Sequence, residues 1–143
     1  MKNRIAKYKS VIRNRVLAGI NVILLKHKQT VIDFNQFQLQ SGFNAEGKKI
    51  TPPYSPSTER IKKSKGDVFD RVTLYDTGAF YRGFLLQGVE FPFRILSSDS
   101  KTPLLAKKYG PIFGLDRESQ RELNTVYLKK DIQIFYRDLL LLQ

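Results

Sequence analysis

The residues best suited to chemistry in this chain are Asp76, Thr77 and Gly78, which follow the stretch V-T-L-Y and precede Ala79. A carboxyl group in such a turn could act as one half of a catalytic pair, in which one carboxyl is protonated while the other is charged. The same residues could instead form a capped turn, because Asp and Thr accept hydrogen bonds from nearby backbone N–H groups and glycine tolerates unusual dihedrals. These two interpretations separate an enzyme from a structural protein.

The catalytic interpretation rests on a resemblance of L-Y-D-T-G-A to the retropepsin-type aspartic protease motif, which pairs across a homodimer. The segment I-F-G-L-D at 112–116 is similar to a later element of that family. That fold requires strands ahead of the motif, where this chain predicts a long helix and a Pro-rich loop, and the short distance to Gly114 leaves little room for a flap. Bulky Phe80, Tyr81 and Arg82 also follow the motif, where that family has small or acidic residues. We therefore predict that the protein is not an enzyme, with a dimeric protease using Asp76 as the remote alternative.

The sequence suggests no other catalytic, cofactor or metal site. There is no cysteine and a single histidine, which excludes a structural zinc site, and neither G-x-x-x-x-G-K nor G-x-G-x-x-G occurs. That histidine, His27, falls on the apolar stripe of a predicted helix, so we expect a hydrogen-bonded core or interface residue. No cofactor and no metal are expected.

Positive charge is concentrated in the first half of the chain. The net charge is +12, and residues 1–65 hold fourteen Lys and Arg against three acids. This imbalance indicates an anionic partner or a basic face within an assembly. Two interpretations remain open for the basic helix surface: it is solvated, or it contacts phosphate or an acidic neighbour. The candidate contacts for DNA or an acidic partner are Lys2, Arg4, Lys7, Lys9, Arg13, Arg15, Lys62, Lys63 and Lys65.

Apolar residues recur every three or four positions over residues 4–34, which predicts one long amphipathic helix. Gly19 in its middle predicts a close helix contact or a bend. Residues 35–71 predict a basic, Pro-rich loop with a short strand or winding excursion near Phe37. A short helix follows, capped by Ser57 or Thr58 and ended by Gly66.

Residues 72–143 predict an α+β core and a C-terminal helix. The expected strands are Phe84–Leu86 and Phe91–Leu96, followed by a helical segment with Pro103 near its start. Asp116 is predicted to cap a long final helix, although alternation at Ile132, Ile134 and Tyr136 leaves a strand as the competing prediction. The fold class is thus α+β in one domain, 1–143, with a long N-terminal helix, a small antiparallel sheet and a C-terminal helix.

Several apolar side chains are expected to contact a partner subunit. The Leu-rich end would be exposed in a monomer, and aromatic residues in the Pro-rich loop suggest anchoring on a neighbour. No apolar run is long enough to span a bilayer, and no signal peptide is expected, so no membrane partner is predicted. The predicted interface residues are Phe43, Tyr54, Leu139, Leu140 and Leu142.

Three short elements, in this order, resemble the phage virion-morphogenesis family, which comprises tail-completion and head–tail connector (neck) proteins. The first is the loop G-K-K-I-T-P-P-Y-S-P-S-T-E-R-I-K-K, beginning at Gly47. The second is Asp76-Thr77-Gly78 followed by Phe80, Gly83 and Phe84. The third is Y-G-P-I-F-G-L-D, residues 109–116.

The resemblance implies a non-enzymatic structural subunit of a tailed bacteriophage, which forms a ring in the neck or tail. It also implies neighbours among other neck, tail or portal proteins, transient contact with genomic DNA, synthesis in the host cytoplasm and a final location in the virion. In that setting Asp76, Thr77 and Gly78 form a structural turn. A basic nucleic-acid-binding protein is the alternative that composition alone keeps open.

Overall fold

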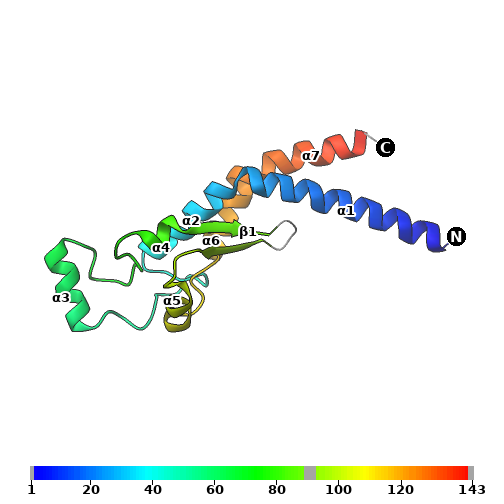
Figure 1. Cartoon of the computed structure of the whole chain (residues 1–143). Helices are drawn as coiled ribbons and strands as arrows, with labels where there is room; N and C mark the ends of the chain where they lie inside the picture. The colour runs from blue at the N-terminus through cyan, green and yellow to red at the C-terminus, as the bar shows by residue number, and fades with distance from the viewer. Residues whose placement is uncertain (1, 89–92, 142–143) are drawn as a thin grey trace.

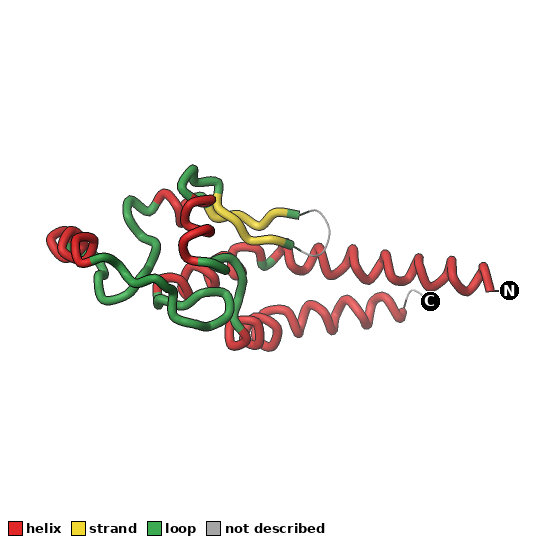
Figure 2. The backbone as a smooth tube through the Cα atoms, turned by 90° about the horizontal axis from the view of Figure 1, so that it is seen from below, coloured by secondary structure: helices red, strands yellow, loops and turns green. Residues whose placement is uncertain are grey.

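The computed structural model describes residues 2–88 and 93–141 and has an α+β fold. Figure 1 shows two long helices, α1 (Lys2–Lys26) and α7 (Lys129–Leu141), projecting from a part built of short helices, a hairpin and loops. Both ends of the chain lie on the same side of the molecule (Figure 2). The predicted fold class, with a long N-terminal helix, a small antiparallel sheet and a C-terminal helix, is confirmed. We call residues 31–115 the head and residues 2–18 the arm.

The first helical stretch differs from its prediction at two places. It breaks at His27, where φ is −99° and ψ is 15°, and it resumes as α2 (Lys28–Gln40). The prediction of one helix over 4–34, followed by a short strand or winding excursion near Phe37, is therefore wrong. The helix continues past Phe34 because the polar side chains of Asn35 and Gln38 are buried and hydrogen-bonded within the head. The apolar periodicity ends there, but the helix continues to Gln40.

Gly19 lies at the contact between α1 and α7. A Cβ atom at this position would lie 2.1 Å from ring atoms of Phe135, far inside van der Waals contact. The predicted close helix contact is thus confirmed, and the missing side chain is its physical cause. Further along, Ile23 and Val31 from the first two helices pack with Leu123 and Leu128 in a small apolar cluster.

The hairpin joins β1 (Phe84–Gln87) to β2 (Arg94–Ser97). Its antiparallel register pairs Phe84 with Ser97 and Gln87 with Arg94. The prediction of two strands here is confirmed, although the second begins at Arg94, and Phe91, its expected start, lies outside the described residues. A two-stranded hairpin is marginal alone, and here Leu86 and Ile95 pack against the cluster at the helix junction.

The head has a second, larger apolar core. Its most deeply buried members are Leu39 and Ile112, at 0% and 1% exposure. Aromatic side chains from α4 (Ala79–Arg82) and the start of β1 complete it. This core therefore joins α2, the D-T-G region and the segment after α5 (Thr102–Tyr109).

Helix ends in the head follow local signals. In α3 (Pro56–Lys65) the cap is Ser55, whose side chain accepts a hydrogen bond from the Thr58 backbone N–H, so the predicted caps Ser57 and Thr58 are wrong. Pro56 occupies the first helical turn, which moves the cap one residue ahead of it. Gly66, with φ of 76°, ends this helix as predicted, and Pro103 lies in the first turn of α5.

The final helical stretch runs from Arg117 to Leu141 through α6 (Arg117–Glu122), the wider π-helical turn η1 (Leu123–Leu128) and α7. Asp116 caps it by accepting a hydrogen bond from the Ser119 N–H, as predicted. The competing strand near Ile132, Ile134 and Tyr136 does not form, because all three lie in α7.

Candidate functional site

The D-T-G segment forms a turn that starts a short helix. Gly78 has φ of 81°, in the left-handed region that glycine favours, and α4 begins at the next residue. The Thr77 hydroxyl accepts a long hydrogen bond, 3.4 Å, from the Ala79 backbone N–H. Leu74 just ahead also has a positive φ, 56°, which costs a leucine about 1–2 kcal/mol. Its buried side chain faces the core, so packing supports this strained backbone.

Asp76 points away from the core, toward two lysines. Its carboxylate lies 3.3 Å from Lys101 Nζ and 3.7 Å from Lys65 Nζ, and its side chain is 59% exposed. The hydrogen bond from Lys101, reinforced by its charge, lowers the pKa of Asp76. A carboxylate that shares a proton needs the opposite environment, in which one pKa is raised. This electrostatic setting favours a structural ion pair.

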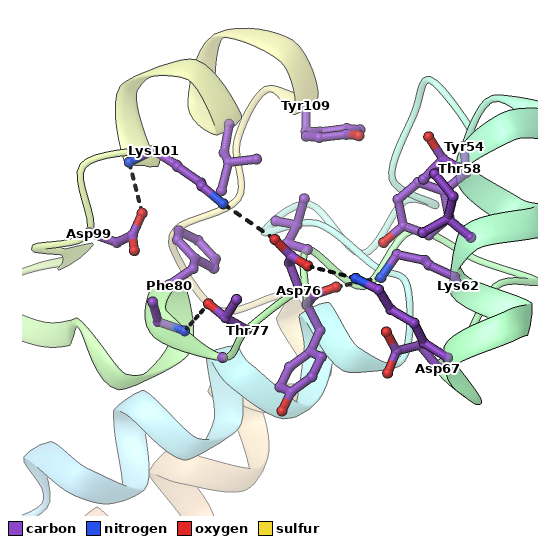
Figure 3. A pocket seen from close by; sticks show the side chains of 17 residues that line it. Tyr54, Thr58, Lys62, Asp67, Asp76, Thr77, Phe80, Asp99, Lys101 and Tyr109 are labelled. Atoms are coloured by element: carbon purple, nitrogen blue, oxygen red, sulfur yellow. Dashed lines mark hydrogen bonds and ion pairs between the residues drawn. The ribbon is translucent and has the colours of Figure 1, made fainter.

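A cavity of about 280 Å³ opens beside this turn, between the D-T-G segment, α3 and α5. Figure 3 shows Asp76 between Lys101 and Lys62, with the Phe80 and Tyr109 rings nearby. The lining surface is mainly apolar, and lysines and acids also contribute to it. Among residues 2–88 and 93–141, no three His, Cys, Asp or Glu side chains lie together as a metal site. The cavity thus offers apolar packing surface together with charged side chains.

Directly behind the turn, aromatic rings connect segments far apart in the sequence. The ring centroids of Phe80 and Phe84 are 5.1 Å apart, Tyr81 stacks on Phe84, and Phe113 lies 5.5 Å from Phe84. The Tyr81 hydroxyl is buried and donates to the Thr73 carbonyl. Burial also raises the pKa of Tyr81. The turn is therefore held by packing from three parts of the chain.

The predicted basic contacts fall into two groups. The arm begins at Lys2, and its other five members, Arg4, Lys7, Lys9, Arg13 and Arg15, are exposed and join no ion pair among the described residues. In contrast, Lys62 is 8% exposed and donates to the Tyr75 carbonyl, with its ammonium 5.1 Å from the Tyr54 ring centroid. This correction removes Lys62 from the surface that DNA or an acidic partner could reach. Lys63 and Lys65 remain exposed on α3.

The predicted interface residues also divide. Tyr54 is half-buried and its hydroxyl accepts a hydrogen bond from the Thr73 N–H, so it anchors the Pro-rich loop within its own chain. Phe43 remains 38% exposed, Leu140 is 67% exposed, and Leu139 is half-buried. Leu142 lies outside the described residues. The anchoring of Tyr54 explains the ordered loop without a neighbouring subunit.

His27 occupies the junction of the two projecting helices. Its Nε2 lies 2.8 Å from Asp131 Oδ2, and because an ionised carboxylate can only accept, the imidazole N–H donates. Lys26 Nζ bonds the same oxygen at 2.9 Å. The hydrogen bond from His27, followed by that from Lys26, lowers the pKa of Asp131. The predicted role of His27 as a hydrogen-bonded residue at a packed contact is confirmed.

Sequence reasoning missed a second group of polar residues. Asn35, fully buried, donates to the Ile112 carbonyl and accepts from the Gly114 N–H, each at 3.1 Å. Gln38 accepts from the Asp116 N–H at 2.9 Å. The sequence pattern that could have indicated their burial is their spacing of three residues, which places them on one helix face. Polar residues at such spacing usually face solvent. They join α2 to the segment that carries I-F-G-L-D.

Comparisons of this chain with protein-family models, with curated proteins and with solved structures found no match. No helix in the described part of the chain is long and apolar enough to cross a membrane.

Proposed function

We propose that this protein is a structural subunit of a tailed bacteriophage that assembles as a ring in the neck or tail and completes the tail or head–tail connection. The main observation that supports the proposed assembly is the exposure of large apolar side chains along both projecting helices. Tyr8 is 60% exposed on the arm, and Leu140 and Leu141 are 67% and 77% exposed on α7. Large exposed apolar side chains of this kind are typical of protein contacts.

The placement in a phage particle is supported by the three sequence elements that resemble virion-morphogenesis proteins, because they pack into one unit. Phe80 and Phe84, after D-T-G, contact Phe113 of the Y-G-P-I-F-G-L-D element. The Ala45 N–H, just ahead of the Gly-Lys loop, donates to the Pro111 carbonyl at 2.8 Å. Elements that share one core are expected to occur together in a sequence for a structural reason.

Native mass spectrometry with negative-stain imaging of the purified chain tests the assembly. We expect one closed species of fixed stoichiometry, and a strict monomer at high concentration would contradict the proposal. Peptide mass spectrometry of purified tailed phage particles from the source culture tests the location. Its absence from particles that contain their other neck and tail proteins would contradict a virion role.

A nucleic-acid-binding function is the second candidate, favoured by the unpaired cations of the arm. Each phosphate contact releases counterions, so the logarithm of the duplex binding constant should fall linearly with the logarithm of salt concentration. Fluorescence anisotropy with labelled duplex DNA measures this slope. Replacing Arg4, Lys7, Arg13 and Arg15 with Glu should abolish binding, and no affinity of the wild type at low salt would exclude this function.

A further inference from the structure

A second concave surface lies between α2 and the start of the final helical stretch. It is a groove of about 650 Å³, and no Lys or Arg is among the described residues that line it. A surface without Lys or Arg is unusual in a chain whose net charge is +12. We call it the acidic groove and define it by its four acids and by two of the aromatic residues that line it: Asp33, Asp116, Glu118, Glu122, Phe37 and Phe43.

The acids of the groove form no ion pair with a cation in the described part of the chain. Of thirteen acids in the sequence, four line this one surface, and none of the four joins an ion pair among the described residues. Asp116 accepts from the Ser119 N–H and Asp33 from the Gln29 amide, both neutral donors. The groove therefore keeps negative charge that a basic partner could neutralise.

The groove also exposes aromatic surface. Phe37 is 70% exposed, Phe43 38% and Tyr127 37%, and each lines the groove. Large apolar groups bordered by charges of one sign are typical of a docking site for an amphipathic segment of opposite charge. The expected occupant is thus a helix with an apolar stripe flanked by cations.

The arm of this same protein has that character. Ile5, Tyr8 and Ile12 recur at helical spacing, and Ile5 and Tyr8 are 53% and 60% exposed. At 3.6 residues per turn, the positions of Arg4 and Arg15 fall on one side of this stripe, and that of Lys9 falls on the other. The arm contains no acid.

The arm cannot reach the groove of its own chain. α1 runs into α2, which forms one wall of the groove. Backbone hydrogen bonds continue across the junction, because the His27 N–H donates to the Ile23 carbonyl and the Val31 N–H donates to the His27 carbonyl. At about 1.5 Å per residue, Tyr8 lies roughly 37 Å along the helix from Asp33. Figures 1 and 2 show the arm extending away from the head. An arm–groove contact must therefore join two molecules.

We propose that the arm of one copy docks in the acidic groove of a second copy. The stripe of Ile5, Tyr8 and Ile12 covers the exposed phenylalanines, while the flanking cations pair with the groove acids. The two surfaces differ, so the contact is heterologous and propagates head to tail, which gives a ring where the rotation closes. This inference rests on the proposed function for the assembly and names the contact that builds it.

Charge-reversal variants of the full chain test the contact. The arm variant replaces three flanking cations with Glu, and the groove variant replaces three acids with Lys and leaves the helix cap Asp116 unchanged. A control variant makes the same charge change as the arm variant on α3 and α5, which contribute no residue to the arm or to the groove lining. The substitutions are Arg4, Lys9 and Arg15→Glu; Asp33, Glu118 and Glu122→Lys; and Arg60, Lys107 and Lys108→Glu.

We expect either single-sided variant to weaken self-association by at least about 100-fold, because like charges then face each other. Mixing the two variants should restore assembly to within about tenfold of wild type, since each reversed arm then meets a reversed groove. The control variant should assemble as wild type does. Analytical ultracentrifugation measures association, and circular dichroism with thermal unfolding verifies that each variant is folded.

The outcomes separate the inference from the proposed function. If the wild type forms a ring whose mass the groove variant leaves unchanged, the arm–groove contact is wrong and the ring stands. If the groove variant assembles normally while the arm variant loses only duplex DNA binding, the partner of the arm is nucleic acid and the contact is wrong. A wild type that remains monomeric overturns both.

Discussion

In the core of the head, large apolar side chains face one another, whereas on the arm Ile5 and Tyr8 face solvent. Leu39 and Ile112 are at most 1% exposed, and Ile5 and Tyr8 are more than half exposed. Both regions show apolar residues at helical spacing, so the pattern alone does not distinguish them. The difference is that several segments converge on the core of the head, while no described segment buries Ile5 or Tyr8 of the arm. An amphipathic helix gains most of its stability from covering its apolar face, which leaves that gain available to a partner of the arm.

The largest effect is expected for a change at Asn35, whose side chain joins two segments of the head. Asn35→Ala removes both bonds of the side chain and leaves the Ile112 carbonyl and Gly114 N–H unpaired in the core. We expect a loss of about 2–4 kcal/mol in the free energy of unfolding, measured by urea denaturation. Asn14→Ala, an exposed change in α1, is the matched control. A loss no greater than that of the control would show that the buried bonds contribute little.

The next largest effect is expected where the arm ends, at Gly19. Gly19→Ala should gain about 1 kcal/mol of helix propensity, but its Cβ would overlap the Phe135 ring. Overpacking of this kind costs about 1–3 kcal/mol, so net destabilisation is expected in thermal unfolding. In a Phe135→Ala background the same change should be neutral or stabilising. Stabilisation by Gly19→Ala in the wild type would mean that the two helices separate at little cost.

A matched pair of hydroxyl deletions sharpens the contrast between the regions. Tyr81→Phe leaves the buried Thr73 carbonyl without its donor and should cost about 1–2 kcal/mol. Tyr8→Phe, the same chemical change in the exposed arm, should lie within about 0.5 kcal/mol of wild type. Urea denaturation measures both. Equal effects would indicate that the arm is as well packed as the head.

The smallest effect is expected at the half-exposed ion pair of the helix junction. The pKa of Asp131 is lowered by His27 and Lys26, so its stabilisation is fully present above the unfolded pKa, about 3.9. It is lost as the pH falls through the lower pKa of the folded state. In Asp131→Asn, the unfolding temperature should therefore fall less steeply as the pH is lowered. Asp138→Asn, which removes an exposed ion pair of the same helix, should leave this pH dependence unchanged. If Asp131→Asn leaves the pH dependence of the unfolding temperature unchanged, the ion pair of Asp131 is not its source.

Features that depend on neighbouring residues were predictable from the sequence. Gly66 ends α3, Asp116 caps α6, and Pro103 lies in a first turn, because each acts within four residues. The error over 35–40 has the opposite origin. Asn35 and Gln38 are buried by bonds to residues more than 75 positions away, which no local pattern contains.

The candidate site divides in the same way. The left-handed Gly78 and the close helix contact at Gly19 depend on the absence of a side chain. The sequence predicted a turn at Gly78 and either a close contact or a bend at Gly19. The partners of Asp76 do not, because Lys65 and Lys101 reach it from two other segments. Burial of Lys62 is likewise decided by the position of the Tyr75 carbonyl and the Tyr54 ring.

The sequence by itself determined where helices and turns begin or end, the α+β class and the concentration of positive charge in the arm, because these depend on side-chain type and short spacing. Only the tertiary structure decided which polar residues are buried and which charges meet. Asp33 and Glu118 are distant in the chain, and they line one groove only because Asn35 and Gln38 bind α2 to the segment ahead of α6. Long-range hydrogen bonds set that geometry, and with it the surface that we propose receives the arm.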